Sequence, residues 1–130
     1  MIHPVRTDLF ASQAPLEWAV VGNGILFTAQ IPIGADGQVV EGGIEAQTRQ
    51  TLDNLAHTLE KAGAGVEALT QVLIYVTARE DLATVNKVYA EYVRAPYPNR
   101  AAIIVSGFAR EAMLVEMVAY AALARSEGGA

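Results

Sequence analysis

One arginine and one glutamate in the last third of the chain have the types and surroundings of reactive groups. Arg100 stands between the loop Pro96-Tyr97-Pro98-Asn99 and an apolar run, and Glu116 lies inside a second apolar run, 114–120. A cation at the mouth of a strand and a carboxylate within one are costly to bury without a reason. A guanidinium can donate two parallel hydrogen bonds to a carboxylate, and a carboxyl group can activate water. The pair therefore suggests a site that binds a small carboxylate and uses water as a reactant.

Both residues also have a purely structural explanation. Arg100 could form a salt bridge at the end of its strand, since ion pairs are common structural devices. Glu116 could pair with Arg100 or line a channel between subunits, and the spacing alone leaves these explanations open. His3 and His57 have no partner at the spacing of metal ligands, and the chain contains no cysteine. No metal site is therefore predicted.

Short β-rich runs and two amphipathic patterns must position Arg100 and Glu116. The turn Gly22-Asn23-Gly24 between apolar runs predicts a hairpin, because Asn and Gly accept the positive φ that such turns need. A period of three to four residues from Ile44 to Leu59 predicts a helix that ends at Gly63, and a second helix is predicted over 80–93. Strands are predicted over residues 18–21, 25–31, 72–77, 101–106 and 114–123, with a short extended run at 38–40.

The order of these elements predicts how they pack. A helix between extended runs, found twice, favours a mixed sheet with both helices on one face. In the last strand Glu116, Val118 and Tyr120 alternate with residues that are also apolar, so neither face of that strand is a plain solvated face. Two helices cover only one face of the sheet. We therefore expect another copy of the chain to cover the other face.

Composition narrows the class of partner. Of the 130 residues, 52% are hydrophobic, and the net charge is -5 without a run of Lys or Arg, so binding of nucleic acid is not expected. The sequence shows no apolar run long enough to cross a membrane and no signal peptide, and cytoplasmic location is predicted. We expect one domain, 1–130, with an irregular arm over 1–15 and a disordered tail over 126–130.

The chain resembles the YjgF/Rid family of small imine and enamine deaminases, from about Gly22 to Ala124. The resemblance rests on several stretches in matching order and spacing. They are Gln30-Ile31-Pro32, Ile44 to Gln50 with Leu52 to Leu55, Val85 to Tyr89, Pro98-Asn99-Arg100 and Val115-Glu116. The resemblance implies an α+β, chorismate-mutase-like fold: a mixed β-sheet with two helices on one face. It also implies a homotrimer whose sheets form a central barrel, with sites in the clefts between subunits.

The family's reaction is the hydrolysis of reactive 2-imino or enamine acids, such as 2-aminoacrylate, to 2-keto acids and ammonia, and it needs no cofactor. By this resemblance Arg100 matches the substrate-binding arginine, and Glu116 matches a strand glutamate that orients or activates the attacking water. Imine hydrolysis needs water to attack the C=N carbon and a proton for the departing ammonia. One carboxyl group with a raised pKa could shuttle both protons.

Four further residues complete the predicted substrate-binding set. Asn86 matches a family position near the cleft, although a polar residue on a helix can also simply face solvent or cap a neighbouring element. Thr28 stands where the family often has Ser and could hydrogen-bond a ligand, although Thr is also at home in a strand. Ala102 and Trp18 are the other two, and Trp18 is a candidate lid over the ligand.

Several departures from the family pattern leave the substrate open. The segment 14–18 has no tyrosine, Thr28-Ala29 replaces Ser-Gly, Ala101 replaces Ser after the arginine, and Val118 replaces a second strand acid. A pathway-specific deaminase, such as one acting on aminomuconate, is one alternative. A non-catalytic trimer that binds small carboxylates or keto acids is another. Ribonuclease activity, described for some family members, is disfavoured by the net charge of -5.

Overall fold

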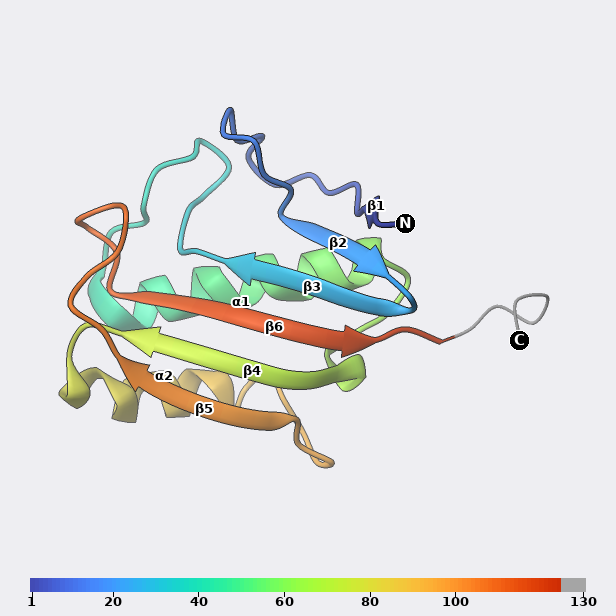
Figure 1. Ribbon diagram of the computed structural model, residues 1–130. Helices are drawn as coiled ribbons and strands as arrows, with labels where there is room; N and C mark the ends of the chain where they lie inside the picture. Colours follow the sequence, from blue (N-terminus) through green and yellow to red (C-terminus); the bar gives the residue numbers. More distant parts are fainter. Residues whose placement is uncertain (125–130) are drawn as a thin grey trace.

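A six-stranded mixed sheet with two helices on one face makes up the computed structural model, which describes residues 1–124 (Figure 1). The strand order is β1-β2-β3-β6-β4-β5, and every neighbouring pair is antiparallel except β4 with β5. The strands are β1 His3–Pro4, β2 Ala19–Gly22, β3 Ile25–Gln30, β4 Leu69–Val76, β5 Asn99–Ile104 and β6 Val115–Ala122. The helices are α1 Gly43–Lys61 and α2 Leu82–Tyr89, with short 3-10 turns η1 Val66–Ala68 and η2 Arg79–Asp81.

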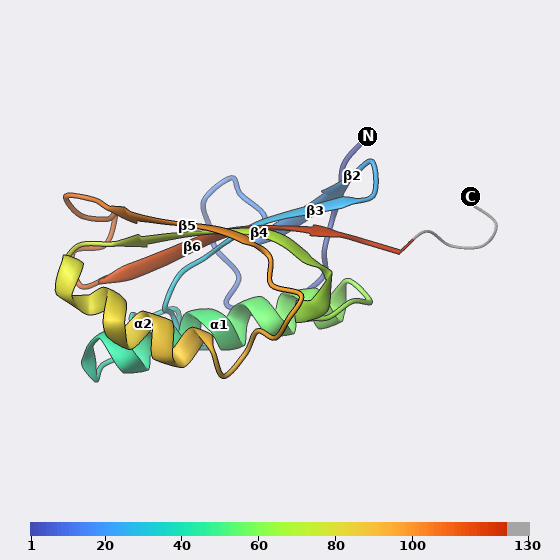
Figure 2. The ribbon, with the colours of Figure 1, turned by 90° about the horizontal axis from the view of Figure 1, so that it is seen from below.

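The predicted placement of both helices on one face is confirmed. In Figure 2, α1 and α2 lie on the same side of the sheet. The parallel pair β4 and β5 requires a crossover connection, and α2 supplies it. The unit β4–α2–β5 therefore places α2 against the sheet beside β5, and this arrangement decides which residues surround Arg100.

The turn between β2 and β3 confirms the predicted hairpin, with positive φ at Asn23 (53°) and Gly24 (77°). Several boundaries differ from the prediction. Strand β4 begins at Leu69 and β5 runs from Asn99 to Ile104, where strands were predicted over 72–77 and 101–106. The second helix ends at Tyr89 instead of Val93, because the chain tightens into i→i+3 hydrogen bonds beyond it. The extended run at 38–40 forms only a single bridge, Ile33 to Val39, and the expected irregular arm contains the short strand β1. The tail expected at 126–130 lies outside the described residues.

The core lies between the helices and one face of the sheet. Alternate residues of the central strands are fully buried there, including Val72, Ile74 and Val76 of β4 and Met117 of β6. Such alternation is the mark of a strand with one face on the core. Helix α1 contributes Leu52, Leu55 and Leu59 to the same layer. Burial of these aliphatic side chains stabilises the fold by about 1.5–3 kcal/mol each.

Helix α1 also buries polar side chains against the sheet; several of them are hydrogen-bonded, whereas the Thr48 hydroxyl has no partner within residues 1–124. The hydroxyls of Thr51 and Thr58 donate to the carbonyls of Gln47 and Asn54, at 2.9 and 2.8 Å. Gln47 donates to the carbonyl of Ala112 at 2.9 Å and accepts from the amide of Leu114 at 2.7 Å. Polar groups buried in this way are satisfied, and Gln47 ties α1 to the segment that leads into β6.

The other face of the sheet, which we call the open face, is apolar and partly exposed. Phe27 and Ile25 are each 40% exposed, and Phe27 packs edge-on against Tyr120 with ring centroids 5.4 Å apart. Large exposed apolar patches mark interaction surfaces. The open face is therefore the surface on which the sequence led us to expect another copy. No helix within residues 1–124 is both long and apolar enough to cross a membrane.

Candidate functional site

Arg100 is held against helix α2. It pairs in register with Val72 of β4, whose side chain is buried under the helices, and residues in register share a face of the sheet. Its Nη2 donates to Oδ1 of Asn86, and its Cζ lies 4.9 Å from the centroid of the Tyr89 ring. A cation over an aromatic face is attracted by the ring's quadrupole. Two of the predicted site residues, Arg100 and Asn86, are thus brought together.

Tyr89 belongs to this cluster, although it was not among the predicted site residues. Its side chain is 7% exposed and its ring carries the Arg100 guanidinium on one face. Burial raises the pKa of Tyr89, and the charge of Arg100 opposes that rise. The hydroxyl is buried without a hydrogen-bond partner among residues 1–124. The signal that could have found it is the spacing of three from Asn86, which puts both side chains on one side of a helix.

Glu116 lies on the open face. It pairs with Tyr75 of β4, whose neighbours Ile74 and Val76 point into the core, so Tyr75 and Glu116 point away from the helices. The carboxyl group is half-buried, and burial raises its pKa. Within residues 1–124 it takes part in no hydrogen bond or ion pair. It is therefore a desolvated acid on an apolar surface.

Arg100 and Glu116 lie on opposite faces of the sheet. Arg100 faces the helices from β5, Glu116 faces the other way from β6, and β4 lies between these strands. The alternative in which Glu116 forms a salt bridge with Arg100 is therefore wrong within one chain. One chain also cannot present both groups to one small molecule. A site that uses both requires a second copy.

Trp18, Val118 and Tyr120 line a cavity of about 230 Å³ on the open face. Thr28 also borders it, but the Thr28 side chain faces the helices, in register with buried Ala119. The Thr28 hydroxyl is committed within the chain, because it donates to the carbonyl of Trp18 at 2.5 Å. Its role as a direct ligand group stays a prediction, and what it does in the structure is to fix Trp18. Ala102 lies two residues beyond Arg100 on the same face of β5 and is exposed.

Other polar side chains join elements to one another. Arg49 of α1 pairs with Glu91 at 2.9 Å on the surface. His57 accepts a hydrogen bond from the amide of Asp8 at 3.0 Å, so it anchors the N-terminal segment on α1. Within residues 1–124, no three His, Cys, Asp or Glu side chains are grouped to hold a metal ion.

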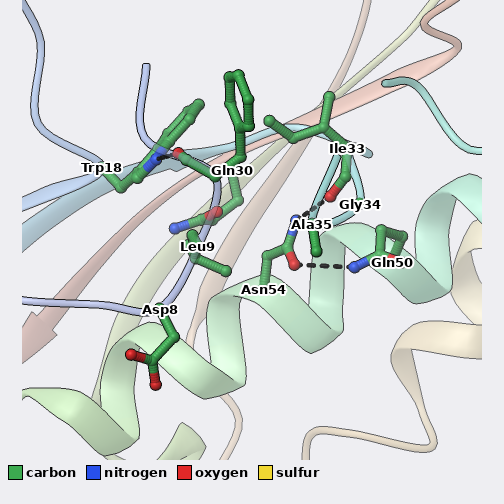
Figure 3. Close-up of a pocket in the computed structure, with 10 residues that line it drawn as sticks. Asp8, Leu9, Trp18, Gln30, Ile33, Gly34, Ala35, Gln50 and Asn54 are labelled. Atoms are coloured by element: carbon green, nitrogen blue, oxygen red, sulfur yellow. Dashed lines mark hydrogen bonds between the residues drawn. The ribbon is translucent and has the colours of Figure 1, made fainter. Parts of the chain in front are cut away.

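A second cavity, of about 150 Å³, lies on the helix side of the sheet (Figure 3). It is enclosed by residues 8–10 and Trp18 of the N-terminal segment, Gln30 of β3, residues 33–35, and Gln50 and Asn54 of α1. Of the predicted site residues only Trp18 lines it. Trp18 thus contributes to the walls of both cavities, because it sits where the N-terminal segment crosses the end of β3.

Comparison with known proteins places these features in a family. Residues 7–123 match the family described as Endoribonuclease L-PSP. The chain is similar to Protein mmf1, mitochondrial, of Schizosaccharomyces pombe, with 37% identity over 103 residues. That match covers 78% of this chain and 63% of the relative, so the chain spans less than two-thirds of that relative's length. Cytoplasmic location stays a prediction.

Solved structures show the same fold. The Rid family protein YyfA of Yersinia pestis, of unknown function, superposes with a TM-score of 0.89 at 32% identity, over 95% of this chain and all of that one. Escherichia coli TdcF, solved with bound serine, superposes with a TM-score of 0.83 at 26% identity, over 95% of this chain and 99% of that one. The α+β architecture described above is therefore that of these proteins.

Proposed function

This chain belongs to the Endoribonuclease L-PSP family, also called the YjgF or Rid family, and from that premise we propose that it hydrolyses reactive 2-imino and enamine acids to 2-keto acids and ammonia. The observation that carries the proposal is the Arg100 cluster. A guanidinium held on one side by Asn86 and on one face by Tyr89 is pre-organised to bind a carboxylate. A 2-imino acid offers that carboxylate directly beside the reacting carbon.

The binding step follows from the geometry of Arg100. A guanidinium has five N–H donors, and within residues 1–124 one of its nitrogens is occupied by Asn86. The remaining donors can bind both oxygens of a substrate carboxylate in parallel. Because Tyr89 limits the swing of the side chain, less rotamer freedom is lost when substrate binds. Binding the carboxylate fixes the C=N carbon at a constant distance from Arg100.

The hydrolytic step needs a proton carrier, and Glu116 is our candidate. An enamine first takes a proton on its β carbon and releases one from nitrogen to solvent, and so becomes the imine. Water then attacks the C=N carbon, the C=N electron pair moves to nitrogen, and the nitrogen takes a proton from the Glu116 carboxyl group. The carboxylate takes a proton from the added water, which leaves a carbinolamine and restores the acid. The Glu116 carboxyl group then protonates the amino nitrogen, the C–N bond breaks with its electron pair going to nitrogen, the carboxylate takes the hydroxyl proton as the C=O bond forms, and ammonia leaves. Burial raises the pKa of Glu116, which favours a carboxyl group that can give a proton as well as take one.

The proposed site lies between subunits of a homotrimer. Because Arg100 and Glu116 lie on opposite faces of one sheet, we assign them to different copies around each substrate. The open-face cavity with Trp18, Val118 and Tyr120 of one copy would then face the Arg100 cluster of the next. The apolar open face supports such an assembly, because Phe27 and Ile25 would be buried by it.

A binding protein without turnover is the second candidate. The similar protein TdcF was solved with bound serine, an amino acid that carries the same carboxylate but no C=N bond. Val118 stands where the sequence comparison led us to expect a second strand acid. The binding candidate would keep the Arg100 cluster and lack the hydrolytic step. The family description names a ribonuclease, but a net charge of -5 does not favour RNA as the substrate.

The deciding experiment uses imines generated in place by an amino-acid oxidase from amino acids with several side chains. Ammonia and keto acid are measured for wild type, Arg100→Ala and Arg94→Ala, an exposed arginine outside the cluster. We expect wild type and Arg94→Ala to accelerate hydrolysis, and Arg100→Ala to lose about a hundredfold in kcat/KM, because two charge-assisted hydrogen bonds are lost. Keto-acid binding that depends on Arg100, without acceleration by wild type on any imine, would select the binding candidate.

A further inference from the structure

The cavity on the helix side of the sheet has walls of two kinds, and its polar wall is unusual (Figure 3). One wall is apolar, formed by Leu9, Phe10, Trp18 and Ile33. The other carries the carboxamides of Gln30 and Asn54, which are 1% and 6% exposed. The orientation of both carboxamides is fixed by their partners, so the chemical character of the polar wall can be derived.

Gln30 must turn its carbonyl oxygen away from its hydroxyl partners. Its Nε2 lies 2.9 Å from the hydroxyl oxygens of both Thr28 and Thr58. The Thr28 proton is already given to the carbonyl of Trp18, at 2.5 Å. The Thr58 proton is given to the carbonyl of Asn54, at 2.8 Å. Both hydroxyls can therefore only accept from Gln30, so its NH₂ group faces them and Oε1 is left for the cavity.

Asn54 is oriented by the same logic. Its Nδ2 donates to the backbone carbonyls of Ile31 and Ile33, at 3.1 and 3.0 Å, and carbonyls only accept. Its Oδ1 therefore points the other way, where it accepts one hydrogen bond from Nε2 of Gln50 at 2.9 Å. An amide oxygen has two lone pairs, so one remains. Within residues 1–124, no donor reaches Oε1 of Gln30.

The polar wall is thus an acceptor wall in an otherwise apolar cavity. The Gln30 oxygen has no donor within residues 1–124 and is not sealed from solvent, so a ligand with N–H or O–H groups can bind it in place of water. The nearest charge, the Asp8 carboxylate at the mouth, is already paired with Nζ of Lys61 at 3.1 Å. An ion would enter without a counter-charge, so a neutral ligand is favoured. A volume of about 150 Å³ is comparable to a cavity that accepts benzene.

We propose that this cavity is a second small-molecule site, selective for a neutral ligand about the size of benzene that carries hydrogen-bond donors at one end. The donor end would bind Oε1 of Gln30 and Oδ1 of Asn54, and the ring would lie against Trp18 and Ile33. The site is distinct from the Arg100 cluster and does not depend on the function proposed above.

The test compares aniline with toluene, which has the same ring and nearly the same size but no donor. Binding to the full-length protein is followed by ¹H–¹⁵N NMR in neutral buffer, where aniline is uncharged. Trp18 is the only tryptophan, so its indole N–H gives a single reporter on the cavity wall. We expect aniline to shift the Trp18 indole and the side-chain amides of Gln30 and Asn54. We also expect it to bind about tenfold more tightly than toluene, the effect of about one net hydrogen bond.

A variant pair locates the binding. Ala35 is exposed at the cavity wall, so Ala35→Leu fills the entrance without entering the core, and Ala109→Leu makes the same change in an exposed loop elsewhere. We expect Ala35→Leu to abolish the aniline shifts and Ala109→Leu to keep them. Absence of shifts in wild type, equal affinity for toluene, or shifts that persist in Ala35→Leu would each overturn the proposal. Imine hydrolysis is not a readout, so the outcome is separate from that of the catalytic proposal.

Discussion

The surroundings of Arg100 and of Glu116 differ in kind. Arg100 has its direction set within the chain, by an amide on one side and an aromatic ring on one face. Glu116 is half-buried on an apolar surface and has no hydrogen-bond or ion-pair partner within residues 1–124. One chain thus builds the carboxylate-binding end of the proposed site completely. It leaves Glu116 on the open face, where a second copy of the chain has to complete the proposed site.

The largest effect is expected when the open face is prevented from being covered by another copy. Phe27→Asp places a carboxylate beside Tyr120 on that face, and burying it in an interface would cost several kcal/mol. We expect wild type to sediment as a trimer at micromolar concentration and Phe27→Asp as a monomer without hydrolytic activity. Ala83→Asp, an exposed residue of α2, is the control and should remain trimeric. A monomeric wild type, or a trimeric Phe27→Asp, would refute the assembly.

The next largest effect is expected at Glu116. Glu116→Gln keeps the shape and removes the proton carrier, so we expect kcat to fall about a hundredfold while KM changes little, because Arg100 binds the carboxylate. Glu111→Gln, in an exposed loop, is the matched control. A fall in kcat/KM that came entirely from KM would show that Glu116 binds substrate instead.

The same variant has a signature in stability. Burial raises the pKa of Glu116 above its ordinary value of 4.5, so between those two values the folded chain holds a proton that the unfolded chain has released. The free energy of unfolding therefore falls as pH rises through that window. Urea unfolding of wild type should show this fall, and Glu116→Gln should show less of it. Equal pH profiles would mean that the carboxyl group is fully solvated.

The smallest effect is expected at Tyr89, and it tests whether the aromatic ring holds the Arg100 side chain in place. Tyr89→Leu removes the aromatic face, and a cation–π contact of about 0.5–2 kcal/mol predicts a rise in KM of roughly two- to thirtyfold. Tyr89→Phe keeps that face and removes only a hydroxyl that has no partner within residues 1–124. We expect its kcat and KM to match those of wild type within about twofold, and its free energy of unfolding to change little. Equal damage from Phe and Leu would assign the role to the hydroxyl.

The sequence predicted the elements better than the faces they present. The β-rich runs over 72–77 and 114–123 and the Asn23-Gly24 turn are local patterns, and the strands and hairpin they predicted are present. The face of Arg100 is not local, because it depends on parallel pairing with Val72, and a shift of one residue would reverse it. For the same reason the separation of Arg100 from Glu116 could not be predicted from their spacing.

Side-chain roles show the same limit. The prediction that Asn86 and Arg100 belong together came from the family resemblance, and the structure does bring them into contact. Tyr89 lies in the apolar stripe of its helix, so its sequence position alone indicates packing. Only the placement of β5 over α2 makes its ring a support for a cation. The remaining site residues, Thr28, Ala102 and Trp18, stay predictions as ligand contacts.

The amide of Gln47 has a consequence for the open face. It offers the peptide groups around Met113 one donor and one acceptor, as a neighbouring strand would, just before β6 begins. If β6 slipped by one residue, Glu116 would enter the core and Met117 would emerge, and both of these hydrogen bonds would be lost. Gln47 thus opposes slippage of the strand that carries the acid. A side chain of helix α1, on the opposite side of the sheet, therefore helps to determine that Glu116, and not Met117, lies on the open face.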